Sequence, residues 1–215
     1  RDPAAWRFSH NAHGKPAIAE ADAEADVGNL RFNLSHTAGL VICGVCRDAE
    51  IGVDTEDVQR PRLNLELAQR YFAPSEAECV RLAEPERQRD VFFHYWTLKE
   101  AYVKARGKGL AIPLSDFSFT RDEHGVARIA FLDDRECPED WRFVEIRLDS
   151  RYRIALAVHL PNRQPLCVQV HETVPLLFQS PPRLLEPNDA QPWEIQSSDG
   201  LAENDDESST ARVTE

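Results

Sequence analysis

The stretch Tyr95-Trp-Thr-Leu-Lys-Glu-Ala-Tyr-Val-Lys-Ala-Arg-Gly-Lys-Gly109 organises the whole sequence. It closes the longest helical segment, predicted from Pro85 to about Arg106, and Gly107-Lys-Gly109 is typical of a helix end. At about 100° per residue, Trp96, Glu100 and Lys104 follow one another along one face of this helix. The sequence therefore predicts a long helix that presents an acid and a lysine together.

Strand and helix signals on both sides of this stretch predict an α+β fold. Predicted strands are rich in β-branched and aromatic residues and are separated by turn residues. They cover residues 6–9, 29–35, 40–46, 51–55, 117–120, 126–131, 141–148, 152–160 and 166–170. Residues 63–72 and a segment beginning at Pro74 predict two further helices.

The segment Ile51-Gly-Val-Asp-Thr-Glu-Asp57 carries two carboxylates two positions apart. Side chains alternate along a strand, so Asp54 and Glu56 are expected on one face. Two carboxylates that share a face are a candidate site for a hard divalent cation. Acidic residues after a strand also commonly mark a solvated turn, and this segment alone does not separate the two interpretations.

Four cations surround Glu100 in an otherwise acidic protein: Lys99, Lys104, Arg106 and Lys108. A Glu one helical turn before a Lys is most often a stabilising surface pair. The density of cations favours a second interpretation, in which the cluster faces phosphate groups and Glu100 reaches the same metal as the strand carboxylates.

Two further patterns favour weaker functional interpretations. Ser35 and His36 are adjacent on an extended segment, where neighbouring side chains point apart, and no nucleophile elbow is present. Phosphate contact is the better functional interpretation, although for this motif alone a capping serine beside a structural histidine would be the default explanation. Cys43 and Cys46 form a CxxC pattern, which can indicate a redox or metal site. Strand alternation sends residues three apart to opposite faces, which argues against that role.

Composition excludes several classes of protein. The net charge is -12, which argues against a nucleic-acid partner, and no apolar run approaches the length of a membrane span. Five cysteines without a framework spacing suit a reducing cytosol. Residues 180–215 hold nine acidic and two basic residues among few apolar ones, which predicts a disordered acidic tail. The chain starts at Arg1 and contains no Met, so we expect an N-terminal truncation.

The motifs occur in a specific order. His13-Gly-Lys-Pro16, Phe32-Asn-Leu-Ser-His36, Ile51 to Glu56 and Trp96 to Lys104, followed by Gly107-Lys-Gly-Leu110, resemble the large monomeric (surfactin-synthetase-activating) class of 4'-phosphopantetheinyl transferases. The resemblance covers roughly residues 6 to 120. It implies two similar α/β lobes that form a pseudo-dimer, with coenzyme A and Mg²⁺ in the cleft between them. Residues 1–50 would be a partial first lobe, 51–160 the second lobe, 161–179 an extension and 180–215 the tail.

The implied activity is transfer of the phosphopantetheine arm of coenzyme A to a serine of an acyl or peptidyl carrier protein, with release of adenosine 3',5'-bisphosphate. Such enzymes serve fatty acid, polyketide or nonribosomal peptide biosynthesis. Carried over by position, Asp54, Glu56 and Glu100 would hold Mg²⁺. Lys15, Ser35 and His36 would contact the nucleotide phosphates, and Lys104 would meet the pyrophosphate.

Several alternatives stay open at this level. The base that deprotonates the attacking serine is either Glu100 or a metal-bound water. The same acids would also suit a divalent-metal nucleotide pyrophosphohydrolase, and a chain lacking the front of the first lobe would suit an inactive coenzyme A or carrier-protein binding module. For carrier docking we expect the helical region from Leu63 to Leu82 together with the basic stretch near Lys104. Arg60, Arg62, Arg70 and the pair Tyr71-Phe72 lie in or near that region. In the alternative interpretation, Leu63, Leu67 and Phe72 face the core and the arginines are solvated.

Overall fold

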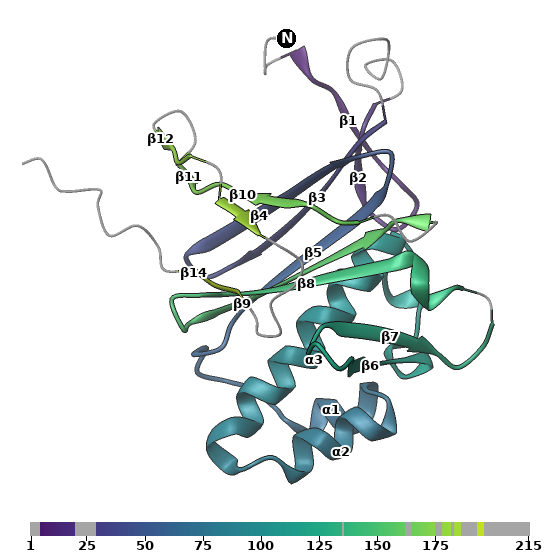
Figure 1. Cartoon of the computed structure of the whole chain (residues 1–215), viewed down its shortest axis with the longest axis vertical. Coiled ribbons are helices and arrows are strands. Elements are labelled where there is room, and N and C mark those ends of the chain that lie inside the picture. The colour runs from purple at the N-terminus through teal and green to yellow at the C-terminus, as the bar shows by residue number, and fades with distance from the viewer. Residues whose placement is uncertain are drawn as a thin grey trace, which may run out of the picture.

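The computed structural model describes residues 5–19, 29–134, 136–161, 165–174, 178–181, 183–185 and 193–195. Helices and strands are mixed along these residues, which confirms the α+β prediction at the level of fold class. A sheet with one long helix across it forms the centre, and a second strand pair packs against the edge of that sheet (Figure 1).

The central sheet has the order β14-β8-β9-β5. The strands β5 (Glu50–Asp57), β9 (Tyr152–His159) and β8 (Trp141–Leu148) pair antiparallel, as expected for the segments predicted there. The strand β14 (Trp193–Ile195) adds in parallel to β8. The register places Asp54 beside Ala155, and Glu56 beside Arg153.

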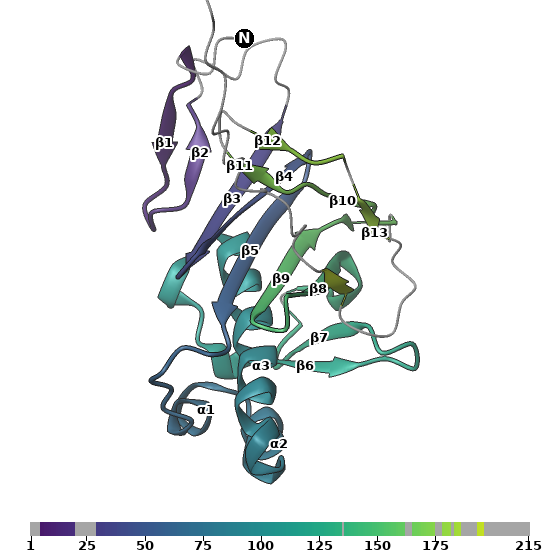
Figure 2. The same ribbon diagram turned by 90° about the vertical axis from the view of Figure 1, so that its left-hand side faces the viewer.

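The helix α3 (Pro85–Arg106) crosses one face of the sheet (Figure 2). Asp54 lies on that face, because its carboxylate pairs with Lys104 of α3. Gly52 makes the close approach possible, because a Cβ atom there would lie 2.1 Å from the carbonyl oxygen of Ala101 and 2.3 Å from the nitrogen of Ala105. The helix ends as predicted at Gly107, whose φ of 63° is left-handed. Backbone packing at Gly52 thus fixes the height of α3 above β5.

Two shorter helices pack against the N-terminal half of α3. They are α1 (Glu66–Tyr71) and α2 (Pro74–Leu82). The first is shorter than predicted, because the side chain of Asn64 accepts a hydrogen bond from the Glu66 amide at 3.0 Å and sets a later start. Phe72 is buried in an aromatic cluster with Phe92 and Trp96, so the interpretation that placed Phe72 in the core is confirmed.

The hairpin of β6 (Phe117–Arg121) and β7 (Ala127–Phe131) completes the core beneath α3. Phe117 and Phe119 pack with Tyr102 and Phe143 there. This cluster is the largest apolar core of the described residues, and it carries the C-terminal half of α3.

A second antiparallel pair, β3 (Leu30–Thr37) and β4 (Leu40–Arg47), lies against the free edge of β5. At this edge, backbone amides of β5 donate hydrogen bonds to side chains of β3. The Asn33 side chain accepts a hydrogen bond from the Val53 amide at 2.8 Å, and the Ser35 hydroxyl accepts one from the Thr55 amide at 3.2 Å. The polar face of β3 is therefore buried, whereas Leu34 on its other face is 47% exposed.

The remaining strands are short. Near the start, β1 (Phe8–His10) pairs with β2 (Pro16–Ile18), and their turn lies close to the end of α3. Later, β10 (Val168–Val170) pairs with β13 (Arg183–Leu185), and β11 (Thr173–Val174) pairs with β12 (Phe178–Gln179).

The prediction of a wholly disordered tail from residue 180 is wrong for two of its segments. Residues 183–185 form β13 and residues 193–195 form β14. Each of these segments holds two apolar residues out of three in an otherwise polar stretch, and strand pairing uses backbone groups, so a short segment of this kind can add to a strand edge. The rest of the predicted tail, apart from residues 180 and 181, lies outside the described residues.

Candidate active site

The strand β5, the helix α3 and the strand β3 bring polar side chains together where α3 crosses the edge of the sheet. Asp54 and Glu56 extend from β5 toward α3, as their two-residue spacing predicts. Glu100 and Lys104 come from α3, one turn apart. Ser35 reaches the same point from β3.

Asp54 is the centre of this cluster. The Lys104 amine donates to Asp54 Oδ1 at 2.6 Å and to the Ser35 hydroxyl at 2.9 Å, and that hydroxyl donates to Asp54 Oδ1 at 3.1 Å. Asp54 is only 5% exposed, and burial raises the pKa of its carboxyl group against the opposing charge of Lys104. Its second oxygen, Oδ2, is buried and has no hydrogen-bond partner.

Glu100 and Glu56 are electrostatically coupled to Asp54. Burial raises the pKa of Glu100 to about 7, the charge of Asp54 adds to this effect, and Lys104 opposes it. Burial and Asp54 also raise the pKa of Glu56, whereas the Arg60 guanidinium and a hydrogen bond from the Trp96 side chain lower it. The charge of Asp54 thus raises the pKa of both glutamates, and the three acids concentrate negative charge at one place.

The chemistry of these donors fits a divalent cation with oxygen ligands. Carboxylates are the ligands that Mg²⁺ uses in proteins, and the unpartnered Oδ2 of Asp54 is an oxygen that a cation would satisfy. The side chains are not arranged as a ready coordination sphere: among the described residues, no group of three His, Cys, Asp or Glu side chains has the geometry to hold a metal ion. Protein cations account for this, because Lys104 pairs with Asp54 and Arg60 with Glu56, at 2.8 Å in the latter pair.

The structure places Lys15 against the end of α3 and His36 on the exposed face of β3; the resemblance assigns both to the nucleotide phosphates. The Lys15 amine donates to Glu50 at 2.8 Å and to the carbonyl oxygen of Ala105 at 2.6 Å. His36 is exposed on the face of β3 opposite to Ser35, as neighbouring strand residues must be. Their roles toward phosphate stay predictions.

The predicted phosphate-facing cluster of four cations is wrong in part. Lys99 is fully buried, pairs with Glu76 at 2.7 Å and donates to the carbonyl oxygens of Leu114 and Phe117 at 2.7 Å each. Arg106 pairs with Glu136 at 2.9 Å. The helical rotation between these positions turns Lys99 and Arg106 away from the face that carries Lys104.

Sequence reasoning missed the role of Asn33 and the pairing of Arg60 with Glu56. A signal existed for Asn33, since Asn33 and Ser35 alternate with the apolar residues of the strand and a buried polar face was one way to use them. No local signal identified Arg60, whose guanidinium lies over the Phe93 ring at 4.8 Å while it holds Glu56.

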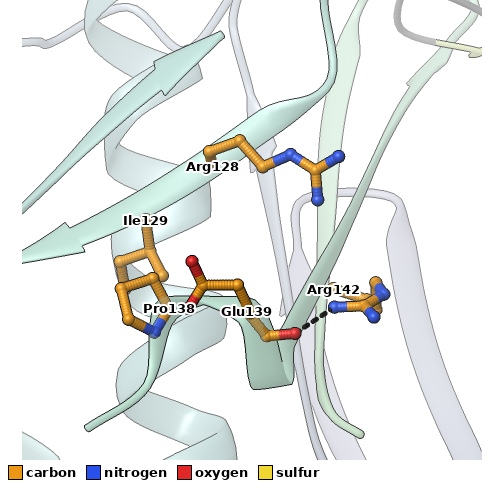
Figure 3. Close-up of a pocket in the computed structure, with 5 residues that line it drawn as sticks. All are labelled: Arg128, Ile129, Pro138, Glu139 and Arg142. Atoms are coloured by element: carbon orange, nitrogen blue, oxygen red, sulfur yellow. Dashed lines mark hydrogen bonds between the residues drawn. The ribbon is translucent and has the colours of Figure 1, made fainter. Parts of the chain in front are cut away.

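A cavity of about 500 Å³ lies elsewhere, beside β7 and β8. Arg128, Ile129, Pro138, Glu139 and Arg142 line it. Figure 3 shows Arg142 bonded to the backbone carbonyl of Glu139, and Arg128 is already paired with Asp122 at 2.7 Å. None of the clustered acids lines this cavity, so the carboxylate cluster, with its perturbed pKa values, remains the candidate site.

No helix of the described residues combines the length and the apolar character that a membrane span requires.

Known proteins resemble this chain in sequence. The 4'-phosphopantetheinyl transferase HetI of Nostoc is 42% identical over 51% of this chain and 45% of its own length. The 4'-phosphopantetheinyl transferase Sfp of Bacillus subtilis is 33% identical over 73% of this chain and 64% of its own length. The human L-aminoadipate-semialdehyde dehydrogenase-phosphopantetheinyl transferase is 27% identical over 82% of this chain and 59% of its own length. The chain thus spans about half to two thirds of the length of these relatives.

A family model covers the part of the chain that holds the candidate site. Residues 50–157, half of the chain, match the model of the 4'-phosphopantetheinyl transferase superfamily. This range includes β5 with both strand carboxylates, all of α3 and most of β9. The match at family level and the clustered acids on β5 and α3 lead to one conclusion: the chain belongs to the 4'-phosphopantetheinyl transferase superfamily.

Proposed function

We propose that the protein transfers the 4'-phosphopantetheine arm of coenzyme A to a serine of an acyl or peptidyl carrier protein and releases adenosine 3',5'-bisphosphate. One observation carries the proposal: Asp54, Glu100 and Lys104 meet within the residues that match the family model. Transfer within a pyrophosphate needs positive charge where the phosphoryl oxygens gather negative charge, and acids that hold a cation or accept a proton.

The proposed roles follow from the positions of the side chains. In this reaction the carrier serine oxygen bonds to the phosphorus that bears the pantetheine arm, and the bond from that phosphorus to the adenosine bisphosphate breaks. Glu100 is the candidate base, because its carboxyl group lies beside Asp54 and Lys104, where the serine and the pyrophosphate would meet; without metal, burial raises its pKa to about 7. Lys104 would exchange its contact with Asp54 for the pyrophosphate.

Asp54, Glu56 and Glu100 would hold Mg²⁺, with the buried oxygen of Asp54 as the best-supported ligand. When bound, the ion would neutralise the pyrophosphate charge. Because the three acids lie together, the charge of Asp54 raises the pKa of Glu56 and Glu100 when no metal is bound.

The arrangement of lobes is also a proposal. The strands β3 and β4 would belong to a first lobe within residues 1–50, and residues 51–160 would form the second lobe of a pseudo-dimer, followed by the extension 161–179. The exposed side chains of Leu34, Val41 and Val45 support an incomplete first lobe, because a contiguous apolar sheet face is normally covered. The five free cysteines suit the cytoplasm, and we propose a monomer that binds neither nucleic acid nor membrane.

Product analysis with coenzyme A and Mg²⁺ tests this function against its two alternatives. We expect adenosine 3',5'-bisphosphate to accumulate only when an apo carrier protein is present. Consumption of coenzyme A without a carrier would identify a pyrophosphohydrolase instead. Binding of coenzyme A with no product under either condition would identify a binding module.

His36 gives a first prediction about substrate recognition. If its exposed imidazole contacts the 3'-phosphate, His36→Ala should weaken binding of coenzyme A by about 1.5 to 3 kcal/mol and leave 3'-dephospho-coenzyme A almost unaffected. Calorimetric titration with both ligands measures the difference. Equal losses for the two ligands would assign His36 no part in phosphate recognition.

Carrier docking gives a second prediction. Arg62 and Arg70 are exposed next to α1, and the Arg70 guanidinium lies over the ring of Tyr71, which is 39% exposed. Charge reversal at either arginine should slow association with an acidic carrier and flatten its salt dependence, while coenzyme A binding stays unchanged. Stopped-flow association across a salt series tests this, with Arg128→Glu on β7, outside the helical region, as control. Identical salt profiles for the variants and the wild type would move the docking surface elsewhere.

A further inference from the structure

The turn between β1 and β2 is closed by one side chain, Asn11. Its amide oxygen accepts hydrogen bonds from the backbone amides of His13 and Lys15, at 2.9 Å each. The Asn11 backbone amide also donates to the carbonyl oxygen of Lys15 at 3.0 Å. An Asn that bonds to following backbone amides in this way fixes a turn.

The same turn binds the C-terminal end of α3. The Asn11 side-chain nitrogen donates to the carbonyl oxygen of Gly107 at 2.7 Å, and the Lys15 amine donates to that of Ala105 at 2.6 Å. The last carbonyl groups of a helix have no partner within it, and a cation is favoured beside them. Two side chains of a distant hairpin thus cap the helix that carries Lys104.

The fit between turn and helix is close. A Cβ atom at Gly107 would lie 2.8 Å from Lys15 Cδ and 3.1 Å from the Asn11 side-chain nitrogen. The left-handed backbone of Gly107, with φ of 63°, further favours glycine. Glu50, at the start of β5, holds the Lys15 amine from the other side at 2.8 Å. The turn is therefore attached to both elements that carry the candidate site.

We propose that Asn11 is a positioning residue for the transfer reaction: it clasps the β1–β2 turn onto the end of α3 and so keeps Lys104 in place. Lys104 lies in the last turn of α3, and its amine must reach Ser35 on β3 and Asp54 on β5. A loosened last turn would move this amine first. The inference rests on the proposed function and adds to it a residue that no catalytic motif contains.

Two substitutions separate the two roles of the Asn11 side chain, which are to close the turn and to bind the end of α3. Asn11→Asp keeps the oxygen that closes the turn and removes the donor to Gly107, whereas Asn11→Ala removes both. Ser9→Ala, at an exposed position of β1, is the matched control. Two readouts are measured: steady-state transfer kinetics, and hydrogen exchange of the Gly107 amide, which donates to the carbonyl oxygens of Val103 and Lys104 at the helix end.

We expect kcat to fall about tenfold or more in both Asn11 variants, with KM for coenzyme A changed by less than about threefold, because a displaced Lys104 affects the transition state more than ground-state binding. Exchange at Gly107 should accelerate by about tenfold or more in both variants and stay unchanged in Ser9→Ala.

Variants with wild-type kcat at a temperature where they are folded would overturn the inference, even if their melting temperature were lower. Unchanged exchange at Gly107 would overturn it as well. A wild-type protein without transfer activity would instead count against the proposed function. The exchange rates at Gly107 would still show whether Asn11 stabilises the end of α3.

Discussion

Glu100→Gln and Asp54→Asn should each reduce transfer by at least about a thousandfold, since loss of a metal ligand or base removes several kcal/mol of transition-state stabilisation. Both substitutions keep the size of the side chain and remove its charge. Glu86→Gln, in the exposed first turn of the same helix, is the control and should retain full activity. Initial rates with saturating coenzyme A, Mg²⁺ and apo carrier measure the effect.

The same Glu100 variant should be at least as stable as the wild type. Without metal, the folded protein raises the pKa of Glu100 from 4.5 to about 7, so the folded state binds more protons than the unfolded state between these values. Glu100 therefore destabilises the fold progressively as pH rises from about 4.5 to 7, and fully above that range. Urea unfolding at pH 5 and pH 8 should show that Glu100→Gln gains stability relative to the wild type at the higher pH. An active variant would refute the assignment of Glu100, and a variant less stable at both pH values would give it a structural role.

Lys99→Met should destabilise the protein by about 3 to 5 kcal/mol, because it leaves a buried carboxylate without its cation. Glu76 accepts hydrogen bonds from the amides of Ala73 and Phe119, and Lys99 donates to two carbonyl oxygens near β6. The pair thus links α2, α3 and β6. Burial opposes charge on both partners, raising the pKa of Glu76 and lowering that of Lys99.

Chemical unfolding of Lys99→Met, Glu76→Gln and the double variant measures this contribution. The double variant should recover part of the loss, because no unpaired charge remains buried. Arg81→Ala is the control: its pair with Glu78 is exposed, at 56% and 50% of the two side chains, and should contribute less than about 1 kcal/mol. A loss of that small size in Lys99→Met would show that the buried pair is not needed for the fold.

Local patterns predicted the elements that carry the site. The two-residue spacing of Asp54 and Glu56 and the four-residue spacing of Glu100 and Lys104 are properties of an isolated strand and helix, and the fold preserves both. The helix end at Gly107 follows equally from local backbone chemistry.

What the sequence did not predict depends on contacts between distant segments. The partner of Lys99 lies on α2, and nothing in the local pattern around Lys99 identifies Glu76. The inward face of β3 was ambiguous, because alternation defines two faces and only the position of β5 decides that Asn33 and Ser35 are buried. Asn11 reads as an ordinary turn residue until its bond to Gly107 is seen.

We expect this protein to modify a carrier protein at a serine. Intact mass spectrometry tests this on an apo carrier incubated with the protein, coenzyme A and Mg²⁺, beside a carrier whose acceptor serine is replaced by alanine. The carrier should gain the mass of one phosphopantetheine arm, the alanine carrier should gain nothing, and Glu100→Gln protein should leave both unchanged. A carrier that keeps its mass while wild-type protein and coenzyme A are present in excess would show that the protein does not transfer the arm.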